Sequence, residues 1–378
     1  MKSHLRQAVG SLMVVGLAER ELSGLERAWL KVVRPGGIIL FRRNIESPAQ
    51  TRALLDEATD LCAPHSFRCV DMEGGTVDRL RNALTPTPSA QAVARAAQHL
   101  KKPALIREQG TLIARASKAF GFNTTLAPVL DLGLPASAAV MGTRVAAATA
   151  QGVVEYGRAF LEGLKAEGVV GCGKHFPGLG GGALDSHLET PSIDRTLREL
   201  QNEDLVPYRA LRDELPMIMV NHAAYPRTPG RQRPASASYY WIATVLRKQI
   251  GYRGIVFSDD LEMGGILKFM PIEEAAIAAL HAGMDMIEIC HSPELILRAY
   301  EALLAEAERS AIFRASIFAR SRRLAAARNR LFPEGTPRML STKQYEALHT
   351  RMERFSATIE KAQPNELHID PNQEACTA

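Results

Sequence analysis

The stretch GVVGCGKHFPGLGGGALDSH, residues 168–187, carries the strongest indication of the fold. It begins with a short, Val-rich apolar run bounded by glycine, a pattern that is typical of a buried strand. Lys174 and His175 follow directly after this run. The stretch therefore predicts a buried strand with a cation and an imidazole at its carboxyl end.

A glycine-rich segment, residues 178–182, comes next and leads to Asp185 and His187. Glycine permits many backbone conformations, so we expect this loop to be mobile. An aspartate close to a histidine can hold the imidazole in one tautomer and raise its basicity. An isolated Asp-Ser-His sequence is more often a turn or a helix cap. Beside the fixed pair at 174 and 175, however, it indicates a movable acid/base pair.

Eight short apolar runs alternate with longer helical patterns along the chain. Strict alternation predicts parallel strands joined by right-handed crossovers. Eight such units favour an α/β fold, a single (β/α)8 barrel over residues 1–332, with an open doubly wound sheet as the alternative. The predicted strands are residues 12–15, 37–41, 67–71, 125–129, 169–173, 217–220, 254–258 and 284–289, and the predicted helices are residues 22–33, 48–62, 104–120, 146–167, 203–213, 239–250, 273–282 and 293–331.

Two stretches do not fit simple connections between these elements. Residues 85–102 are long for a strand-to-helix loop, and we expect them to fold over the barrel mouth. Residues 333–378 follow the barrel as a C-terminal extension. We expect a last helix over residues 340–360 and a disordered polar tail over residues 363–378.

Polar side chains stand at four of the predicted strand ends. A barrel of parallel strands gathers its reactive groups at these carboxyl ends. One such group is often part of a structural ion pair, whereas four that converge on one rim indicate a functional site. They are Asp71 with Arg79 after the third strand, Lys174 and His175 after the fifth, Asn221 and His222 after the sixth, and Asp259 and Asp260 after the seventh.

Asp259 is the first charged residue after a mainly apolar run. We expect Lys174 and Arg144 to lie near it and to favour its ionised form, as a nucleophile requires. Asp260 is expected on the other side of the strand, packed between strand and helix, because successive side chains alternate.

Composition argues against several classes of function. The chain of 378 residues has a net charge of +5, but its basic residues are spread among acidic ones, so we expect no nucleic-acid partner. No stretch reaches the length of a membrane span and no signal-peptide pattern is visible, so we expect no membrane association. Five cysteines without a C-x-x-C motif predict a reducing compartment, the cytoplasm. We also expect a monomer.

A metal site is disfavoured by the same residues. His175, Asp185, His187 and His222 are metal-ligand types. Lys174 would repel a dication beside His175, and neither a His-x-His nor a His-Glu-x-x-His spacing is present. We therefore expect no metal and no cofactor.

Five motifs, taken in order, resemble glycoside hydrolase family 3, and most closely its bacterial β-N-acetylhexosaminidases of cell-wall recycling. Single motifs of this set are moderately specific, whereas the ordered set is highly specific. The motifs are Asp-x-Glu-Gly-Gly-x-Val-x-Arg at 71–79, Leu-Ala-Pro-Val-Leu-Asp at 126–131, Lys-His-Phe-Pro-Gly at 174–178, Asp-Ser-His at 185–187 and Phe-Ser-Asp-Asp-Leu at 257–261.

The resemblance implies a single (β/α)8 domain and retaining hydrolysis of terminal β-linked N-acetylglucosamine from N-acetylglucosaminides such as muropeptides. It implies that Asp259 attacks the anomeric carbon and that His187, oriented by Asp185, is the acid/base. The positions that hold the sugar in the family correspond to Asp71, Arg79, Arg144, Lys174 and His175.

The chain departs from the family at Leu179, where a histidine is usual. This change can alter loop contacts or aglycone preference without removing the acid/base pair. Three alternatives remain open at this point: a phosphorylase of the same fold, a β-glucosidase, and a sugar-binding barrel without activity. The glucosidases usually take their acid/base from a second domain, for which this chain has no room, and an inactive barrel should have lost Asp259 or the pair.

Overall fold

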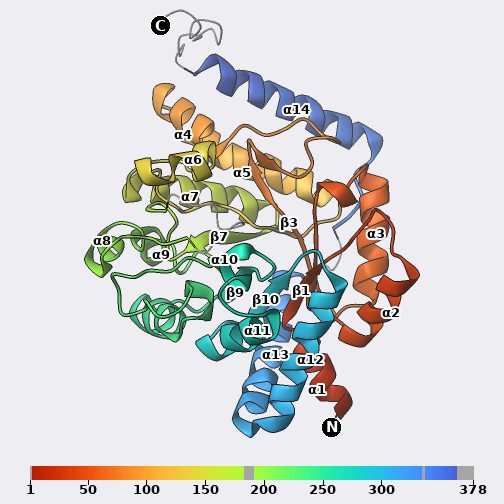
Figure 1. Ribbon diagram of the computed structural model, residues 1–378. Helices are drawn as coiled ribbons and strands as arrows, with labels where there is room; N and C mark the ends of the chain where they lie inside the picture. Colours follow the sequence, from red (N-terminus) through yellow and green to blue (C-terminus); the bar gives the residue numbers. More distant parts are fainter. Residues whose placement is uncertain (1, 183–190, 334–336, 364–378) are drawn as a thin grey trace, which may run out of the picture.

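The computed structural model describes residues 2–182, 191–333 and 337–363. Eight parallel strands close into a barrel, and their order around it follows the chain, with the last strand pairing back onto the first (Figure 1). This closed sheet confirms the predicted (β/α)8 fold and rules out the open sheet. The strands are β1 (Met13–Gly16), β2 (Gly37–Leu40), β3 (Phe67–Val70), β6 (Thr124–Thr125), β7 (Val170–Phe176), β8 (Met217–Val220), β9 (Ile255–Asp260) and β10 (Met286–Ile289).

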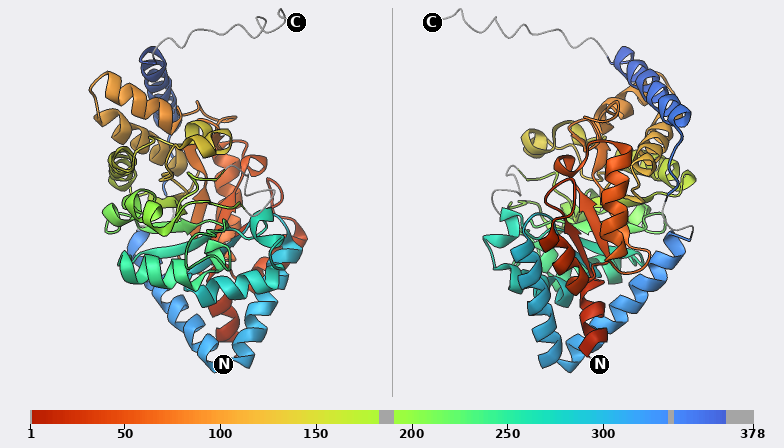
Figure 2. Two further views of the ribbon diagram at one scale, coloured as in Figure 1. Left: turned by 60° about the vertical axis from the view of Figure 1, so that its left-hand side comes forward. Right: turned by 90° about the vertical axis from the view of Figure 1, so that its right-hand side faces the viewer.

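Helices surround the barrel (Figures 1 and 2). Several begin at a side-chain cap that accepts a free backbone N–H of the first turn, as at Ser23, Ser47 and Thr149. The main helices of the described chain are α1 (Lys2–Gly10), α2 (Gly24–Val33), α3 (Pro48–Asp60), α5 (Ala104–Ala119), α7 (Ala150–Ala166), α8 (Leu197–Asn202), α9 (Val206–Ala210), the π-helix η5 (Tyr240–Gln249), α11 (Ile272–Ala282), α12 (Pro293–Arg309) and α13 (Ala311–Leu331).

Two predicted helices differ from the structure. The pattern at 203–213 corresponds to the short helix α9 alone, and the pattern at 293–331 divides into α12 and α13. Ser310 makes this division, because its extended backbone ends α12 and its side chain accepts the N–H of Phe313 at the start of α13. Apolar periodicity continues across such a cap, so the pattern alone does not show the break.

Short elements connect the strands to the helices at the carboxyl end of the barrel. A small antiparallel hairpin follows β3 and leads to Arg79. A chain of short helical turns between β6 and α7 ends at Arg144. These and the other short elements are β4 (Met72–Gly74), β5 (Val77–Asp78), η1 (Arg42–Asn44), η2 (Pro135–Ser137), α6 (Ala138–Met141), η3 (Gly142–Arg144), η4 (Ala235–Ala237) and α10 (Gly264–Leu267).

The stretch at 85–102 differs from its prediction. It contains a helix, α4 (Ala90–His99), that Ser89 caps and that packs against α5 and η3 at the side of the barrel (Figure 1). The predicted last helix is confirmed as α14 (Thr342–Lys361), which lies along α4 and α5. Residues 364–378, most of the predicted tail, lie outside the described residues. The division into two domains at 332 stays a prediction.

The core forms between the strands and the helix layer, and apolar side chains also fill the barrel. Cys62, Cys69, Cys172 and Cys290 are buried as free thiols and pack as small core residues. No helix in the described part of the chain has both the length and the apolar character needed to cross a bilayer.

Candidate active site

A cavity of about 560 Å³ opens at the carboxyl ends of the strands. Six of the eight predicted site residues line it: Asp71, Arg79, Arg144, Lys174, His175 and Asp259. The other two, Asp185 and His187, lie outside the described residues. The third, fifth and seventh strand ends therefore converge as predicted, whereas Asn221 and His222 at the sixth strand end do not line this cavity.

Irregularities in two strands bring neighbouring residues into the cavity. On β9, the pairs Phe257–Met286 and Asp260–Glu288 leave one more residue on β9 than on β10. A bulge of this kind breaks the alternation of side chains. Asp259 and Asp260 consequently both line the cavity, and the expectation that Asp260 packs away from it is wrong.

β7 has the same irregularity. Its pairs Gly173–Ile218 and Phe176–Val220 enclose two residues of β7 against one of β8. Those two residues are Lys174 and His175, and both line the cavity. They thus belong to the strand itself rather than to the loop after it.

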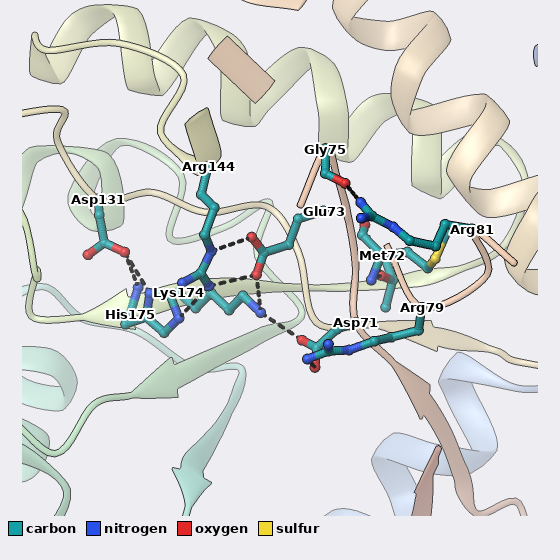
Figure 3. A network of polar contacts seen from close by, with 11 residues as sticks. Asp71, Met72, Glu73, Gly75, Arg79, Arg81, Asp131, Arg144, Lys174 and His175 are labelled. Atoms are coloured by element: carbon teal, nitrogen blue, oxygen red, sulfur yellow. Dashed lines mark hydrogen bonds and ion pairs between the residues drawn. The ribbon is translucent and has the colours of Figure 1, made fainter. Parts of the chain in front are cut away.

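Four buried or half-buried charges form one network across the cavity wall (Figure 3). Lys174 Nζ lies 2.8 Å from Asp71 Oδ1 and 2.6 Å from Glu73 Oε1. Arg144 binds the same Glu73 in a bidentate manner, with Nε and Nη2 each 2.8 Å from a carboxylate oxygen. Glu73 occurs in the motif at 71–79, but sequence reasoning did not select it as a site residue.

Opposing effects set the ionisation of this network. Burial alone would raise the pKa of Glu73, but Arg144 and Lys174 outweigh it and hold that pKa well below its usual range. The pKa of Asp71 is also lowered, since Lys174 and Arg79 outweigh its burial. The pKa of Lys174 is raised by Asp71 and Glu73 despite its burial. All these groups are therefore charged at neutral pH.

We expected Lys174 and Arg144 near Asp259, and all three residues line the same cavity. The ion pairs of the two cations go to Asp71 and Glu73. Asp259 Oδ1 instead accepts the backbone N–H of Asp260 at 3.0 Å. The carboxylate shares the cavity with the cations without being neutralised by an ion pair to either of these two.

Asp131 holds the segment that carries His175. Its Oδ2 lies 2.6 Å from His175 Nδ1 (Figure 3). Its Oδ1 accepts the backbone N–H of Leu179 at 2.7 Å. Arg144 Nη2, a donor, lies 3.4 Å from His175 Nε2. A neutral ring with its proton on Nδ1 satisfies both neighbours. Sequence reasoning quoted Asp131 in a motif but gave it no role; its place at the end of the run 126–131 was the available signal.

The glycines after Pro177 serve close packing. Gly178 has a φ of +142°, and a Cβ there would lie 2.8 Å from the side chain of Asp204. A Cβ on Gly180 would lie 2.6 Å from the carbonyl oxygen of Leu132. Both positions therefore require glycine. Leu179 between them is buried and lines the cavity. The predicted mobility concerns the loop up to His187, whose second half, residues 183–187, lies outside the described residues.

The histidines weighed as metal ligands have other partners. His222 donates from Nε2 to the carbonyl oxygen of Asp260 at 2.9 Å, and its Nδ1 lies 2.7 Å from Ser236 Oγ. One group among the described residues does bring three ligand types together: Asp260, Glu262 and His291, with ligand atoms within 4.8 Å of one another. The absence of a metal stays a prediction.

Comparison with known proteins places this geometry in a family. The family model described as the Glycosyl hydrolase family 3 N terminal domain matches residues 4–327, the whole barrel. The chain belongs to glycosyl hydrolase family 3. A curated relative, the beta-hexosaminidase of Alkalilimnicola ehrlichii, is 41% identical over 291 residues, which are 76% of this chain and 82% of that protein.

Solved structures agree with this assignment. A family 3 β-N-acetylglucosaminidase from Paenibacillus sp. is 31% identical, with a TM-score of 0.82 over 93% of this chain and 68% of that one. NagZ from Neisseria gonorrhoeae, solved in complex with N-trifluoroacetyl-D-glucosamine, is 28% identical, with a TM-score of 0.73 over 93% of this chain and 98% of that one. The family 3 chain is thus a glycoside hydrolase with a (β/α)8 barrel.

Proposed function

We propose that this family 3 chain is a retaining β-N-acetylhexosaminidase that releases terminal β-linked N-acetylglucosamine. One observation carries the proposal: Asp259 lines the same cavity as Lys174, His175 and Asp71, at the carboxyl end of the barrel. The curated relatives support the choice of sugar, because they carry the name beta-hexosaminidase at up to 41% identity.

In the proposed mechanism a carboxylate oxygen of Asp259 attacks the anomeric carbon. The bond from that carbon to the glycosidic oxygen breaks, and a proton passes to this oxygen from the acid. Water then attacks the same carbon and gives a proton back to the acid/base group, while the ester bond to Asp259 breaks. Two inversions at one carbon retain the β configuration.

We assign the acid/base role to His187, with Asp185 as its partner. The support is the Asp-Ser-His motif, since these residues lie outside the described part of the chain. An imidazole can give and then take a proton near neutral pH, and a carboxylate partner increases its basicity.

The charged network suits a sugar. Asp71 and Lys174 are held rigidly by their ion pairs and present an acceptor and a donor to hydroxyl groups in a cavity of about 560 Å³. Arg79 Nη2 lies 3.5 Å from Asp71 Oδ2 and adds a further donor at the same wall. We therefore assign sugar binding to Asp71, Arg79, Arg144, Lys174 and His175.

The biological setting follows from the same proposal. Muropeptide fragments of peptidoglycan are the proposed natural substrates, on the basis of the family branch that the motifs resemble. The cytoplasm is the proposed compartment, which the four buried free thiols support. We propose that the enzyme acts as a monomer.

The test compares wild type with Asp259→Asn on nitrophenyl β-glycosides of N-acetylglucosamine and of glucose. We expect wild type to prefer the N-acetylglucosaminide and the variant to lose about a thousand-fold or more in kcat. Asp194→Asn, at an exposed aspartate, is the matched control and should keep full activity. A preference for the glucoside, or full activity of Asp259→Asn, would contradict the proposal.

The same assay with added phosphate separates a hydrolase from a phosphorylase. A hydrolase releases the free sugar at a rate that phosphate does not change, whereas a phosphorylase yields the sugar 1-phosphate. Lys174 and Arg144 are already paired with carboxylates, so they offer little net positive charge to phosphate. We expect the free sugar as the product.

A further inference from the structure

We propose that Glu288 is a further substrate-contacting residue, which forms a hydrogen bond with a hydroxyl group of the sugar bound in the cavity. The inference rests on the proposed function, and it adds a residue that neither the motifs nor the charged network includes. It concerns the deep part of the cavity, where β10 passes beside the strand that carries Asp259.

The position of Glu288 is fixed by its backbone. It lies on β10, where its N–H donates to Ser258 Oγ at 2.9 Å and its carbonyl oxygen accepts the N–H of Leu261 at 2.9 Å. The side chain is 2% exposed and lines the cavity. A charged or polar group so placed on a central strand cannot move to bulk solvent.

The carboxyl group of Glu288 has an unused acceptor. Among the described residues, its Oε1 is buried and has no hydrogen-bond partner. A buried polar atom without a partner costs free energy, so such atoms are rare in folded proteins. A ligand hydroxyl that enters the cavity would supply the missing partner.

The neighbours of Glu288 favour its neutral form. Burial raises its pKa well above the usual range, and the carboxylates of Asp260, Asp71 and Asp259 raise it further, against a smaller opposite effect of Lys174. Two buried thiols in the barrel, Cys69 and Cys172, add no compensating positive charge. A neutral carboxyl group both donates and accepts a hydrogen bond, which is what a sugar hydroxyl needs.

This chemistry distinguishes Glu288 from the charged network. Asp71, Glu73 and Lys174 satisfy one another before any sugar arrives. Glu288 Oε1 has no such partner among the described residues, and a hydroxyl group of the bound sugar would supply one. A sugar that lacks this hydroxyl should therefore be discriminated against, because it leaves the buried carboxyl group unpaired.

The test measures binding by calorimetry, so it does not depend on hydrolysis. N-acetylglucosamine and its 3-deoxy, 4-deoxy and 6-deoxy analogues are titrated into wild type, Glu288→Leu and Glu288→Gln. We expect wild type to bind one deoxy analogue about ten-fold more weakly than the parent sugar, as loss of one neutral hydrogen bond predicts. Glu288→Leu should bind the parent sugar about ten-fold more weakly than wild type does. Within this variant, that deoxy analogue should bind less than about two-fold more weakly than the parent sugar. Glu288→Gln, which keeps a donor and an acceptor, should lose less than Glu288→Leu.

The inference would be overturned if Glu288→Leu lost the same affinity, relative to wild type, for all four sugars, or lost none. It would also be overturned if wild type did not bind N-acetylglucosamine. Met286→Leu, on the same strand and buried but outside the cavity lining, is the control and should bind every sugar as wild type does. Thermal unfolding of each variant shows that it is folded. Failure of the proposed function appears separately, as lack of hydrolysis by wild type.

Discussion

Glu73 lies between Arg144 and Lys174. It accepts two hydrogen bonds from Arg144 and forms an ion pair with Lys174, whose Nζ lies 2.6 Å from Glu73 Oε1. This carboxylate comes from the short strand β4, whereas its two cations come from η3 and β7. Glu73 therefore joins three strand ends of the barrel into one rigid wall of the cavity.

Glu73→Gln tests this role. The change leaves Arg144 without its bidentate partner and two buried cations near each other. We expect the free energy of unfolding to fall by about 3 kcal/mol or more, and kcat/KM to fall with it. Urea unfolding and steady-state kinetics measure both. Glu214→Gln removes a comparable partner of Arg158 at the surface and should cost less than about 1 kcal/mol. Equal costs for the two variants would contradict the assignment.

Asp131→Ala tests how the segment after His175 is held. The variant removes the acceptor of His175 Nδ1 and of the Leu179 N–H. We expect the amide of Leu179 to exchange its hydrogen faster and KM to rise, because His175 loses its fixed orientation. Hydrogen exchange followed by mass spectrometry over residues 175–182 measures the first effect. Asp194→Ala serves as the exposed control, and unchanged exchange in Asp131→Ala would show that Asp131 does not hold the segment.

Asp204 gives a prediction on pH. It is 1% exposed, and neither of its carboxylate oxygens has a hydrogen-bond partner among the described residues, although Arg195 Nε lies 3.3 Å from Oδ2. Burial raises its pKa to about 7, with Arg195 acting in the opposite direction. The folded state therefore binds more protons than the unfolded state between about pH 4 and pH 7, and stability falls as pH rises through this range.

Asp204→Asn should remove this loss. We expect its free energy of unfolding, relative to wild type, to increase between pH 5 and pH 8 by up to about 3 kcal/mol. Urea unfolding at a series of pH values measures the difference. Asp213→Asn, at an exposed aspartate, should leave the pH dependence of wild type unchanged. A constant difference between Asp204→Asn and wild type across the range would show that Asp204 is ionised throughout.

The C-terminal helix α14 offers a fourth prediction. It packs against α4, and α4 packs against η3, which ends at Arg144 (Figures 1 and 2). Phe355 is one of the buried residues of α14. We expect Phe355→Ala to lower the free energy of unfolding by about 3–5 kcal/mol, as for other buried phenylalanines, and to raise KM several-fold. Thr350→Ala on the exposed side of the helix is the control. An unchanged KM in a destabilised Phe355→Ala would confine α14 to a role in stability.

Hydrophobic pattern was sufficient to predict the barrel. Each of the eight apolar runs overlaps a barrel strand, although β6 shares only Thr125 with the run 125–129. The polar residues at the ends of the third, fifth and seventh runs lie in one cavity. Periodicity reports which face of an element is buried, and a barrel of parallel strands follows from eight such runs in alternation with helices.

The site differs from the prediction at positions that depend on an irregularity within a strand or on an ion pair between residues far apart in the sequence. The bulge on β9 places Asp260 in the cavity, and a pattern that assumes strict alternation cannot show it. Glu73 forms ion pairs with Arg144 and Lys174 that the sequence did not predict, because the hairpin after β3 folds back toward η3 and β7. Pairing between residues 71 to 101 positions apart leaves no periodic signal in the sequence.

The most direct test of the mechanism is covalent trapping of the nucleophile. Wild type is incubated with a fluorinated N-acetylglucosaminide that forms the glycosyl-enzyme faster than water cleaves it, and the digested protein is mapped by mass spectrometry. We expect one sugar per chain, attached to the peptide that contains Asp259, and no label in Asp259→Asn. A label on another residue, or turnover of the reagent without a label, would contradict the assignment of Asp259 as the nucleophile.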